Sequence, residues 1–583
     1  MNYAIEDARK LLEEVSGIKV GPEDIKVSQV SDISSTIAFR LAKESKKNPE
    51  DIAEDLVGKI KPRGFIESVE AVNGYINFQL KYENFSKHVL ESILNSVEDY
   101  GKPLVSPKEK IVLEHTSVNP SGPIHVGRLR NSIIGDSIKR ILSFTGYDVE
   151  TRYWVNDIGK QIGIIAAILN KSFSFDNEDY KRYEQELGLE LKDKYKRYEN
   201  KDDFWIFFEY VIGNRIFEED KSFQGEVQKL IRDAESGDKK ALENMKKAAS
   251  TCLKGQLETF NRLGINFNFF DYESMLLTSK EIPEIIKTLK KHRLWVEKDI
   301  GSGLDLSGFG LEKRAGATIM LREDGTTVYI TRDLAYHLMK MKRGDRLINV
   351  LGEDHKFEFQ ELKTILTEIF KVKKPIDVVH YSFVSFGGTK LSTRKGETAP
   401  VDQLIDEAIE KAKSEIEKRG IAGKETAKVI GIGAVKYHII KTAPSKPITF
   451  SWEEALSFDG EASPYIQYVH ARSCRILEKS GEDVGKINVE KIDLNLEDIE
   501  KQLLKEISLF PDVIERSAIE LKPNLIANYL YSLASTYNKF YIKCPVLPAE
   551  KEVRERRLLI VYSVKQIIGT GLSLLGIEAP DKM

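Results

Sequence analysis

Three short segments of the chain carry the residue types that bind phosphate groups. They are residues 114–128, 352–355 and 385–396, and together they are rich in histidine, lysine, arginine, carboxylates and glycine. Imidazole and ammonium groups donate hydrogen bonds to phosphate oxygens, and glycine lets a nucleotide approach the backbone closely. The chemistry expected here is the binding of a triphosphate.

Each of these segments follows or overlaps the end of an expected strand. Short apolar runs at 111–113, 347–351 and 378–384 read as strands. The first is followed by a helical pattern over 125–144 and a further strand at 149–155, which makes a βαβ unit and implies a parallel sheet. Ligands of open parallel sheets bind outside the carboxyl ends of the strands. The three segments therefore predict one site at one edge of the sheet.

The first segment places His125 and Gly127 at the start of the helix, where unpaired N–H groups and the positive end of the dipole suit a triphosphate. Asn131 lies one turn further on and is a weaker ATP candidate. A plain alternative is that His125 only caps the helix.

In the third segment, glycines flank the cations Lys390, Arg394 and Lys395. Such a loop could close over phosphates, although it lacks the Walker A spacing. The plain alternative is a solvated basic loop.

Bulk properties limit the class of protein. The chain has 583 residues, which predicts three or four domains, and it is 41% apolar and 31% charged, as ordinary globular proteins are. No apolar run is long enough for a membrane span, and no targeting segment is evident. The three cysteines, Cys252, Cys474 and Cys544, are too far apart to suggest a disulfide framework or a zinc site. We expect a cytoplasmic protein, with no membrane association and no side chain assigned to a metal, and we expect a monomer.

The patterns along the chain predict a multidomain α/β protein. We expect a small α+β domain at 1–85, a linker helix at 86–108, and a parallel-sheet catalytic domain at 109–402 with a helical insertion at about 160–310. A helical connector at 403–454 and an all-α domain at 455–583 follow. In the first domain we expect helices at 4–15 and 33–43, the second capped by Ser31 or Asp32, and a hairpin turning at Asn73-Gly74. A second hairpin, with strands at 319–321 and 327–330, is expected around Asp324-Gly325.

Two motifs resemble the signatures of class I aminoacyl-tRNA synthetases. His125-Val126-Gly127-Arg128 resembles their His-Ile-Gly-His sequence, and Lys390-Leu391-Ser392-Thr393-Arg394 resembles their Lys-Met-Ser-Lys-Ser loop. The surrounding blocks are similar to the arginyl branch of the class: Asn119-Pro120-x-Gly122-Pro123, Tyr153-x-Val155-Asn156-Asp157-x-Gly159-x-Gln161, Tyr329-x-Thr331-Arg332-Asp333, Gly352-Glu353-Asp354-His355 and Pro464-Tyr465-x-Gln467-Tyr468. Arg128 and Thr393 depart from the signatures, so a one-to-one assignment of transition-state contacts does not carry over.

The resemblance implies a Rossmann-type catalytic domain that uses ATP with Mg²⁺ to activate L-arginine and load it onto tRNA(Arg). A planar guanidinium is best held by carboxylates, and the resemblance implies an arginine site of Glu114, Asn119, Tyr329 and Asp333. It implies ATP contacts from His125, Gly127, Asn131, Gly352, Asp354, His355 and Lys390. For catalysis it suggests His125, Arg128, Lys390, Arg394 and Lys395.

For several of these residues a structural role is the alternative. Asp333 could be a helix N-cap, Tyr329 a core aromatic and His355 an ordinary cap. The C-terminal domain would bind the anticodon, with Tyr541 and Met583 as candidate contacts, whereas most of its other aromatic rings are expected in the bundle core.

Three other functions stay open at this point. Another class I synthetase, such as the cysteinyl one, shares the fold but would need clustered cysteines for a zinc site. A nucleotidyltransferase of the same superfamily would leave the N-terminal module and the long helical region without a purpose. A synthetase-like RNA-binding protein without catalysis is suggested only by Arg128 and Thr393.

Overall fold

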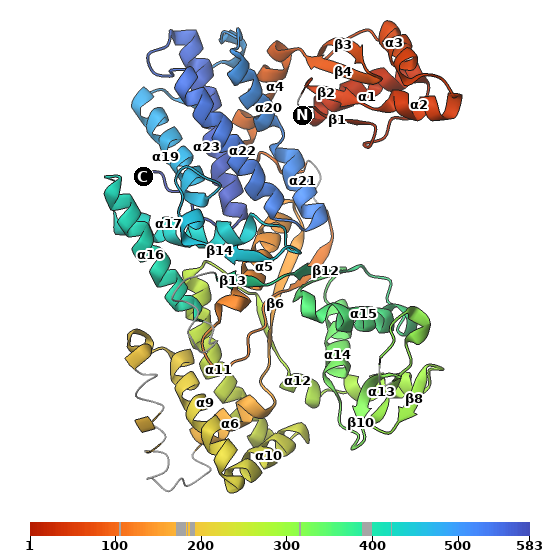
Figure 1. The fold of residues 1–583 in the computed structure, drawn as a ribbon, viewed down its shortest axis with the longest axis vertical. Helices are drawn as coiled ribbons and strands as arrows, with labels where there is room; N and C mark the ends of the chain where they lie inside the picture. Colours follow the sequence, from red (N-terminus) through yellow and green to blue (C-terminus); the bar gives the residue numbers. More distant parts are fainter. Residues whose placement is uncertain are drawn as a thin grey trace.

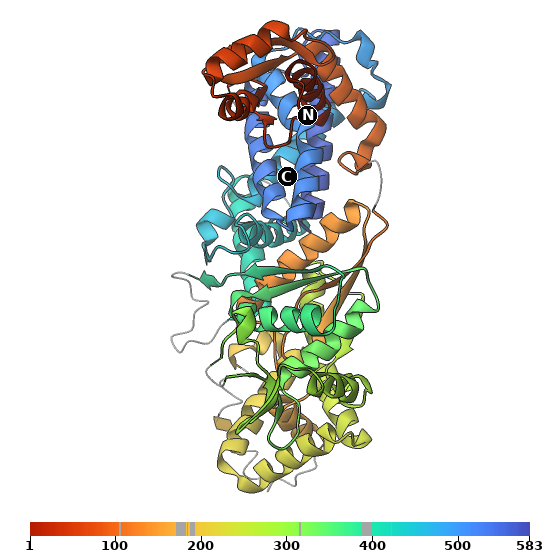
Figure 2. The ribbon, with the colours of Figure 1, turned by 90° about the vertical axis from the view of Figure 1, so that its right-hand side faces the viewer.

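The computed structural model describes residues 1–28, 30–103, 107–170, 182, 185–186, 193–313, 316–386, 399–420 and 423–583. The molecule is elongated (Figure 1). A small N-terminal unit and a helical bundle occupy one end, the main sheet lies in the middle, and a group of helices lies at the other end (Figure 2).

The N-terminal unit is an antiparallel sheet covered by helices. Its strands have the order β1-β2-β4-β3, and Asn73 and Gly74, with φ of 50° and 79°, make the expected turn between β3 and β4. The second helix differs from expectation, because residues 33–35 pair with β4 as a strand and the helix begins at Ile37 with Thr36 at the N-cap. The elements are α1 (Asn2–Ser16), β1 (Ile25–Val27), β2 (Ile33–Ser35), α2 (Ile37–Ser45), α3 (Pro49–Lys59), β3 (Ile66–Val72) and β4 (Tyr75–Leu80).

A five-stranded parallel sheet forms the centre of the molecule. Its order is β12-β11-β5-β6-β7, so β5 is the middle strand and the chain leaves it first toward β6 and later toward β11. Helix α5 packs on the sheet and also against helices of the C-terminal bundle. The elements are β5 (Lys110–Glu114), α5 (Val126–Phe144), β6 (Asp148–Val155), β7 (Phe269–Tyr272), β11 (Arg346–Gly352), α15 (Lys356–Thr364), a π-helical turn (Ile365–Ile369) and β12 (Ile376–Tyr381).

The expected helical insertion at about 160–310 is not a single insertion. Its first part is helical, but residues 269–272 return to the main sheet as the edge strand β7. The helices of this first part are α6 (Lys160–Leu169), α9 (Asp202–Glu219), α10 (Lys221–Glu235) and α11 (Lys239–Arg262).

A second segment outside the main sheet follows β7 and contains a separate antiparallel sheet of order β10-β9-β8. The turn at Asp324-Gly325 is present, but the expected strand at 327–330 is reduced to one bridge between Thr327 and Leu321 before helix α14 begins. The elements are α12 (Ser274–Leu277), α13 (Glu281–Lys290), β8 (Trp295–Lys298), β9 (Gly301–Leu304), β10 (Thr318–Arg322) and α14 (Tyr329–Met341).

The last third of the chain is almost wholly helical, as expected. It begins with a short parallel pair, β13 with β14, and continues into a bundle. Helix α4 (Tyr82–Ser96), which follows the N-terminal unit, packs on α20 and α23 of this bundle. The elements are β13 (Val384–Phe386), α16 (Val401–Lys418), α17 (Lys424–Ile440), β14 (Ile448–Phe450), α18 (Trp452–Ala455), α19 (Ser463–Ser480), α20 (Asp498–Ser508), α21 (Phe510–Glu520), α22 (Asn524–Lys543) and α23 (Lys551–Leu574). Across the described residues, every helix is too short or too polar to cross a bilayer.

Candidate active site and RNA-binding surface

Two of the three segments that we expect to bind phosphate meet at the carboxyl edge of the main sheet. Glu114 ends β5 and lies opposite Asn349 of β11, three residues before Gly352 ends that strand. Between β5 and β11 the chain connections diverge to opposite sides, which is the switch point where open parallel sheets bind ligands.

The loop after β5 is held in an unusual backbone conformation. Thr116 has φ of 69°, a left-handed geometry that costs a residue with a Cβ about 1–3 kcal/mol. Asn131 Oδ1 accepts a hydrogen bond from Thr116 N at 3.1 Å, and the Thr116 hydroxyl donates to Ser132 Oγ at 3.0 Å. Asn131, expected to contact ATP, therefore uses its side-chain oxygen to position this loop.

The outer part of the same loop is held by a residue that the sequence did not single out. Gln256 of α11 is buried, and its amide donates to the carbonyl oxygens of Asn119 (3.2 Å) and Gly122 (2.7 Å). The Asn119 side chain accepts from Asn156 Nδ2 at 2.9 Å and donates to Gln161 Oε1 at 3.3 Å. Exposed Asn119 and half-buried Asn156 and Gln161 thus form one polar cluster between the blocks at 119–123 and 153–161.

The N-terminus of α5 is open toward this edge. His125 occupies the N-cap position, but its side chain makes no capping hydrogen bond, so capping does not explain this histidine. His125, Gly127 and Arg128 are all exposed, and a Cβ placed on Gly127 would meet no atom within 4 Å. The first helical turn therefore presents its positive dipole end and the exposed backbone at Gly127 to this edge, whereas Arg128 N donates to His125 O at 2.9 Å.

The third segment lies mostly outside the described residues, and with it Lys390, Arg394 and Lys395. The first described residues after this segment are hydrogen-bonded to the start of α5. Val126 N donates to Ala399 O at 3.1 Å, and Val401 N donates to Ile124 O at 2.8 Å. On the other side, β13 ends at Phe386 and contacts α5. Both ends of the third segment are thus anchored beside the first segment.

Tyr329 and Asp333 lie on one face of α14, separated by one turn. The Tyr329 ring is 75% exposed, which rules out a core position, and Val328 rather than Asp333 is the N-cap residue. The Asp333 side chain is 50% exposed, and its Oδ1 lies 2.9 Å from His337 Nδ1. Partial desolvation raises the pKa of Asp333, but the nearby His337 and Lys340 lower it by more, so its pKa lies below the usual range.

Glu114 is paired with a buried cation. Its Oε2 accepts a hydrogen bond from Lys340 Nζ of α14. Helix α14 thereby connects the end of β5 with the exposed face that carries Tyr329 and Asp333.

Gly352, Asp354 and His355 surround the end of β11. A Cβ on Gly352 would lie 2.2 Å from Asp354 Oδ1, so this turn requires glycine. The side chains of Asp354 and His355 are about half exposed, and His355 Nε2 lies 3.7 Å from Asp354 Oδ2. His355 occupies the N-cap position of α15 without making a capping hydrogen bond.

A second histidine beside the site is unsuited to proton transfer. His115 is buried between Gly135 of α5 and Phe267, and burial, with a smaller effect of Lys139, lowers its pKa to about 3. His115 therefore stays neutral at physiological pH, and its role is packing rather than acid–base chemistry.

On the C-terminal bundle, a cation lies between two exposed or half-exposed rings. The Arg472 guanidinium is 4.6 Å from the Tyr468 ring centre and 4.4 Å from that of Tyr541, which is 42% exposed. Rings and guanidinium planes in such an arrangement can stack on unpaired bases. By contrast, Tyr529, Tyr537 and Phe540 are buried, as expected for the bundle core.

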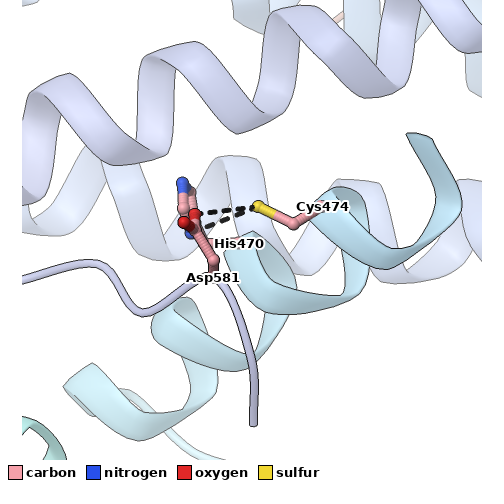
Figure 3. A group of neighbouring side chains, drawn as sticks. All are labelled: His470, Cys474 and Asp581. Carbon is pink, nitrogen blue, oxygen red and sulfur yellow. Dashed lines mark hydrogen bonds between the residues drawn. The ribbon is translucent and has the colours of Figure 1, made fainter. Parts of the chain in front are cut away.

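The chain end is fastened to the same helix, α19. His470 Nδ1 lies 3.0 Å from Pro580 O, and Cys474 Sγ lies 3.8 Å from that nitrogen and 3.4 Å from Asp581 Oδ1 (Figure 3). These three side chains could in principle ligate a metal ion. However, a nitrogen that faces a carbonyl oxygen must carry a hydrogen atom and has no lone pair for a metal.

The Cys474 thiol also holds its proton. Burial, and the proximity of Asp581, raise its pKa to about 11 in spite of Lys565. The cluster is therefore a set of hydrogen bonds that holds the last residues of the chain, just before Met583, against α19.

Comparisons with known families and proteins cover the whole chain. The family described as tRNA synthetases class I (R), catalytic domain, matches residues 89–452. The Arginyl tRNA synthetase N terminal domain matches residues 2–80, and the DALR anticodon binding domain matches residues 466–583.

Curated relatives and solved structures agree with these matches. The arginine–tRNA ligase of Methanococcus maripaludis (strain S2) is 39% identical, over 98% of either chain, and that of Archaeoglobus fulgidus is 38% identical, over 96% of either chain. The structure of Thermus thermophilus arginyl-tRNA synthetase aligns over all of both chains with a TM-score of 0.78 and 25% identity. Because these matches cover nearly all of the chain, it belongs to the arginyl-tRNA synthetase family of class I aminoacyl-tRNA synthetases.

Proposed function

We propose that this chain joins L-arginine to tRNA(Arg) in two ATP-dependent steps, with both reactions at the carboxyl ends of β5 and β11. The observation that carries the proposal is the meeting of two features at one sheet edge. One is the two carboxylates Glu114 and Asp333, which contact Lys340 and His337 of α14, the helix that also carries the exposed ring of Tyr329. The other is the open N-terminus of α5 with His125 and Gly127.

In the first step, a carboxylate oxygen of arginine attacks the α-phosphorus of ATP. The P–O bond to the β-phosphate breaks, pyrophosphate leaves, and arginyl-adenylate forms. The N–H groups of α5 and His125 would stabilise the charge on the phosphates, with Gly127 allowing close approach and Asp354 and His355 near the ribose. We assign Lys390, Arg394 and Lys395, with Arg128, to the leaving pyrophosphate. Mg²⁺ would enter bound to the phosphate oxygens of ATP, so we assign it no side chain.

The arginine pocket would use charge and shape together. Glu114 and Asp333 would face the guanidinium with carboxylate oxygens, the geometry in which a planar cation is best bound. The Tyr329 ring, one turn before Asp333, would lie against it. Asn119, in the polar cluster with Asn156 and Gln161, would hold the α-amino or carboxylate group of the substrate.

In the second step, a hydroxyl of the terminal ribose of the tRNA attacks the activated carbonyl carbon and AMP leaves. If the behaviour of the class holds, this is the 2′-OH. Tyr541 and the chain end at Met583 are our candidates for anticodon contacts, and the N-terminal unit would contact the body of the tRNA. We further infer that the protein acts in the cytoplasm, where its family serves translation, and as a monomer.

The test is arginine-dependent exchange of pyrophosphate into ATP, with and without tRNA(Arg), in the wild type and in Glu114→Gln. Exchange by the wild type in either condition would support the function. Exchange only when tRNA is present would add that the tRNA completes the site. The variant should raise the arginine KM at least about tenfold, because a neutral amide replaces a carboxylate that faces a cation. An unchanged arginine KM in Glu114→Gln would remove Glu114 from the pocket, and no exchange by the wild type would contradict the function itself.

A further inference from the structure

Lys340 lies beneath the proposed arginine pocket and is 1% exposed. Its ammonium group has three acceptors within reach: Glu114 Oε2, Asn349 Oδ1 at 3.1 Å and His337 Nε2 at 3.2 Å. An ammonium carries three N–H donors, so all three are used. The charge of Lys340 is thereby compensated in a place where an unpaired charge would be strongly unfavourable.

These contacts also fix the state of His337. Because Nε2 accepts from the ammonium, the ring hydrogen must lie on Nδ1. That nitrogen donates to the backbone carbonyl oxygen of Asp333 at 3.0 Å and also lies 2.9 Å from Asp333 Oδ1, so its N–H is within reach of the second carboxylate of the pocket. A continuous set of contacts therefore runs from Asp333 through His337 and Lys340 to Glu114, and it links the two carboxylates that the proposed function assigns to the guanidinium.

The set also balances the charge of the pocket. Two carboxylates alone carry a charge of −2, and their mutual repulsion would weaken the ionised state of each. One buried ammonium reduces the total to −1, which matches the single positive charge of a guanidinium. The Tyr336 ring, 4.4 Å from Lys340 Nζ, adds a further favourable contact with the cation.

We propose that Lys340 is a positioning and specificity residue of the arginine pocket: it orients Glu114, and with His337 it holds Asp333, so that the pocket presents one net negative charge. Lys340 acts through these side chains and does not itself contact the substrate. The inference rests on the proposed roles of Glu114 and Asp333 in binding arginine.

A buried lysine can also have a purely structural role. A second buried lysine of the chain is therefore the matched control for Lys340. Lys436 of α17 is likewise 1% exposed, and its ammonium donates to Gly576 O at 2.6 Å, away from the sheet edge. If burial alone mattered, Lys340→Met and Lys436→Met would have similar effects. Both variants remove an ammonium from the interior and keep a side chain of similar length.

The experiment measures the KM for arginine, the KM for ATP and the thermal midpoint of Lys340→Met, Lys436→Met, Glu114→Gln and the double variant Glu114→Gln/Lys340→Met. We expect Lys340→Met to raise the arginine KM at least about tenfold, as the loss of a buried charge partner should, with the ATP KM within about twofold. Lys436→Met should leave both KM values within about twofold. In the Glu114→Gln background, Lys340→Met should have a smaller effect than in the wild type, because only its action through His337 and Asp333 remains.

The outcomes separate the two proposals. If Glu114→Gln raises the arginine KM and Lys340→Met does not, the role of Lys340 is wrong and the pocket stands. If Glu114→Gln itself has no effect, the pocket assignment is wrong as well. Independent, multiplying effects of the two substitutions would also overturn the inference. Should Lys340→Met not fold, His337→Leu makes the same test, since leucine has neither a donor for Asp333 nor an acceptor for Lys340, and a selective rise in the arginine KM is again required.

Discussion

At the scale of single residues, the position of His125 in the fold gives the clearest indication of a role at the active site. It takes the N-cap position of α5 without capping it, on the side where the helix dipole and the exposed backbone at Gly127 face the site. We expect His125→Ala to lower kcat by about 100- to 1000-fold, the usual cost of losing one donor to a transition-state charge, with the arginine KM within about threefold. Steady-state aminoacylation with arginine and ATP varied separately measures both parameters.

A histidine remote from the site serves as the control for His125. His292 lies in the turn between α13 and β8, where its side-chain Nδ1 accepts a hydrogen bond from Leu294 N at 3.4 Å, so His292→Ala should leave kcat unchanged. A large rise in the arginine KM of His125→Ala at preserved kcat would instead assign His125 to the amino-acid pocket.

From the sequence we could predict residues whose type or motif indicates a chemical role. We could not predict residues whose role depends on which side chains the fold places beside them. Tyr329 and Asp333 were found because a motif contained them. The positions of Gln256, which holds the loop carbonyls, and of Lys340, which pairs with Glu114, depend on which element lies opposite in the fold. In the sequence, both are ordinary polar residues of helices. Asn131 stays a predicted ATP contact, and the sequence did not indicate that its oxygen also supports Thr116.

At the scale of elements, helix α5 has two glycines with different purposes. A Cβ on Gly127 would meet nothing within 4 Å, whereas a Cβ on Gly135 would lie 2.2–2.4 Å from ring and Cβ atoms of His115. We expect Gly135→Ala to lower the thermal midpoint by several degrees, because overpacking a core costs about 1–3 kcal/mol.

Gly127→Ala should leave the thermal midpoint unchanged or slightly raised, since alanine favours a helix more than glycine does. It should nevertheless raise the ATP KM several-fold, because the added methyl group occupies the space over the helix start. Thermal unfolding and ATP-dependent kinetics of the two variants make the comparison. A stable Gly127→Ala enzyme with a normal ATP KM would contradict nucleotide binding at this turn.

The main parallel strands were predictable from their apolar runs, and the elements that were missed are short or lie at edges. Strand β7 has four residues and a buried aspartate, Asp271, whose carboxylate accepts from Arg152 and Tyr336, so its sequence has no apolar run. Residues 327–330 have strand-forming side chains, yet the helix begins at Tyr329, because tertiary context overrides local preference. Residues 33–35 join the sheet through β4 for the same reason.

At the scale of the whole molecule, the N-terminal unit and the bundle are fastened together. Lys505 of α20 donates to the carbonyl oxygens of Ser28 (2.8 Å) and Ser31 (3.1 Å) and lies 3.2 Å from Asp32 Oδ1. Helix α5 in turn contacts helices α21 and α23 of the bundle. A tRNA bound at the bundle surface would therefore rest on a unit that packs directly against the helix at the active site.

The proposed tRNA contacts lie on the bundle, whereas the proposed pockets for arginine and ATP lie at the sheet edge. Substitution of Tyr541 tests whether tRNA recognition is independent of arginine and ATP binding. Its exposed ring beside Arg472 offers a stacking surface, and stacking of one base contributes about 1–3 kcal/mol. We expect Tyr541→Ala to raise the tRNA KM roughly tenfold, while the arginine and ATP KM values at saturating tRNA stay within about twofold. Tyr541→Phe keeps the ring and should stay near the wild type. Aminoacylation at varied tRNA concentration decides between stacking and a hydroxyl contact: equal losses in the two variants would show that the ring does not stack, and an altered arginine KM would show that the bundle surface and the active site are not separate.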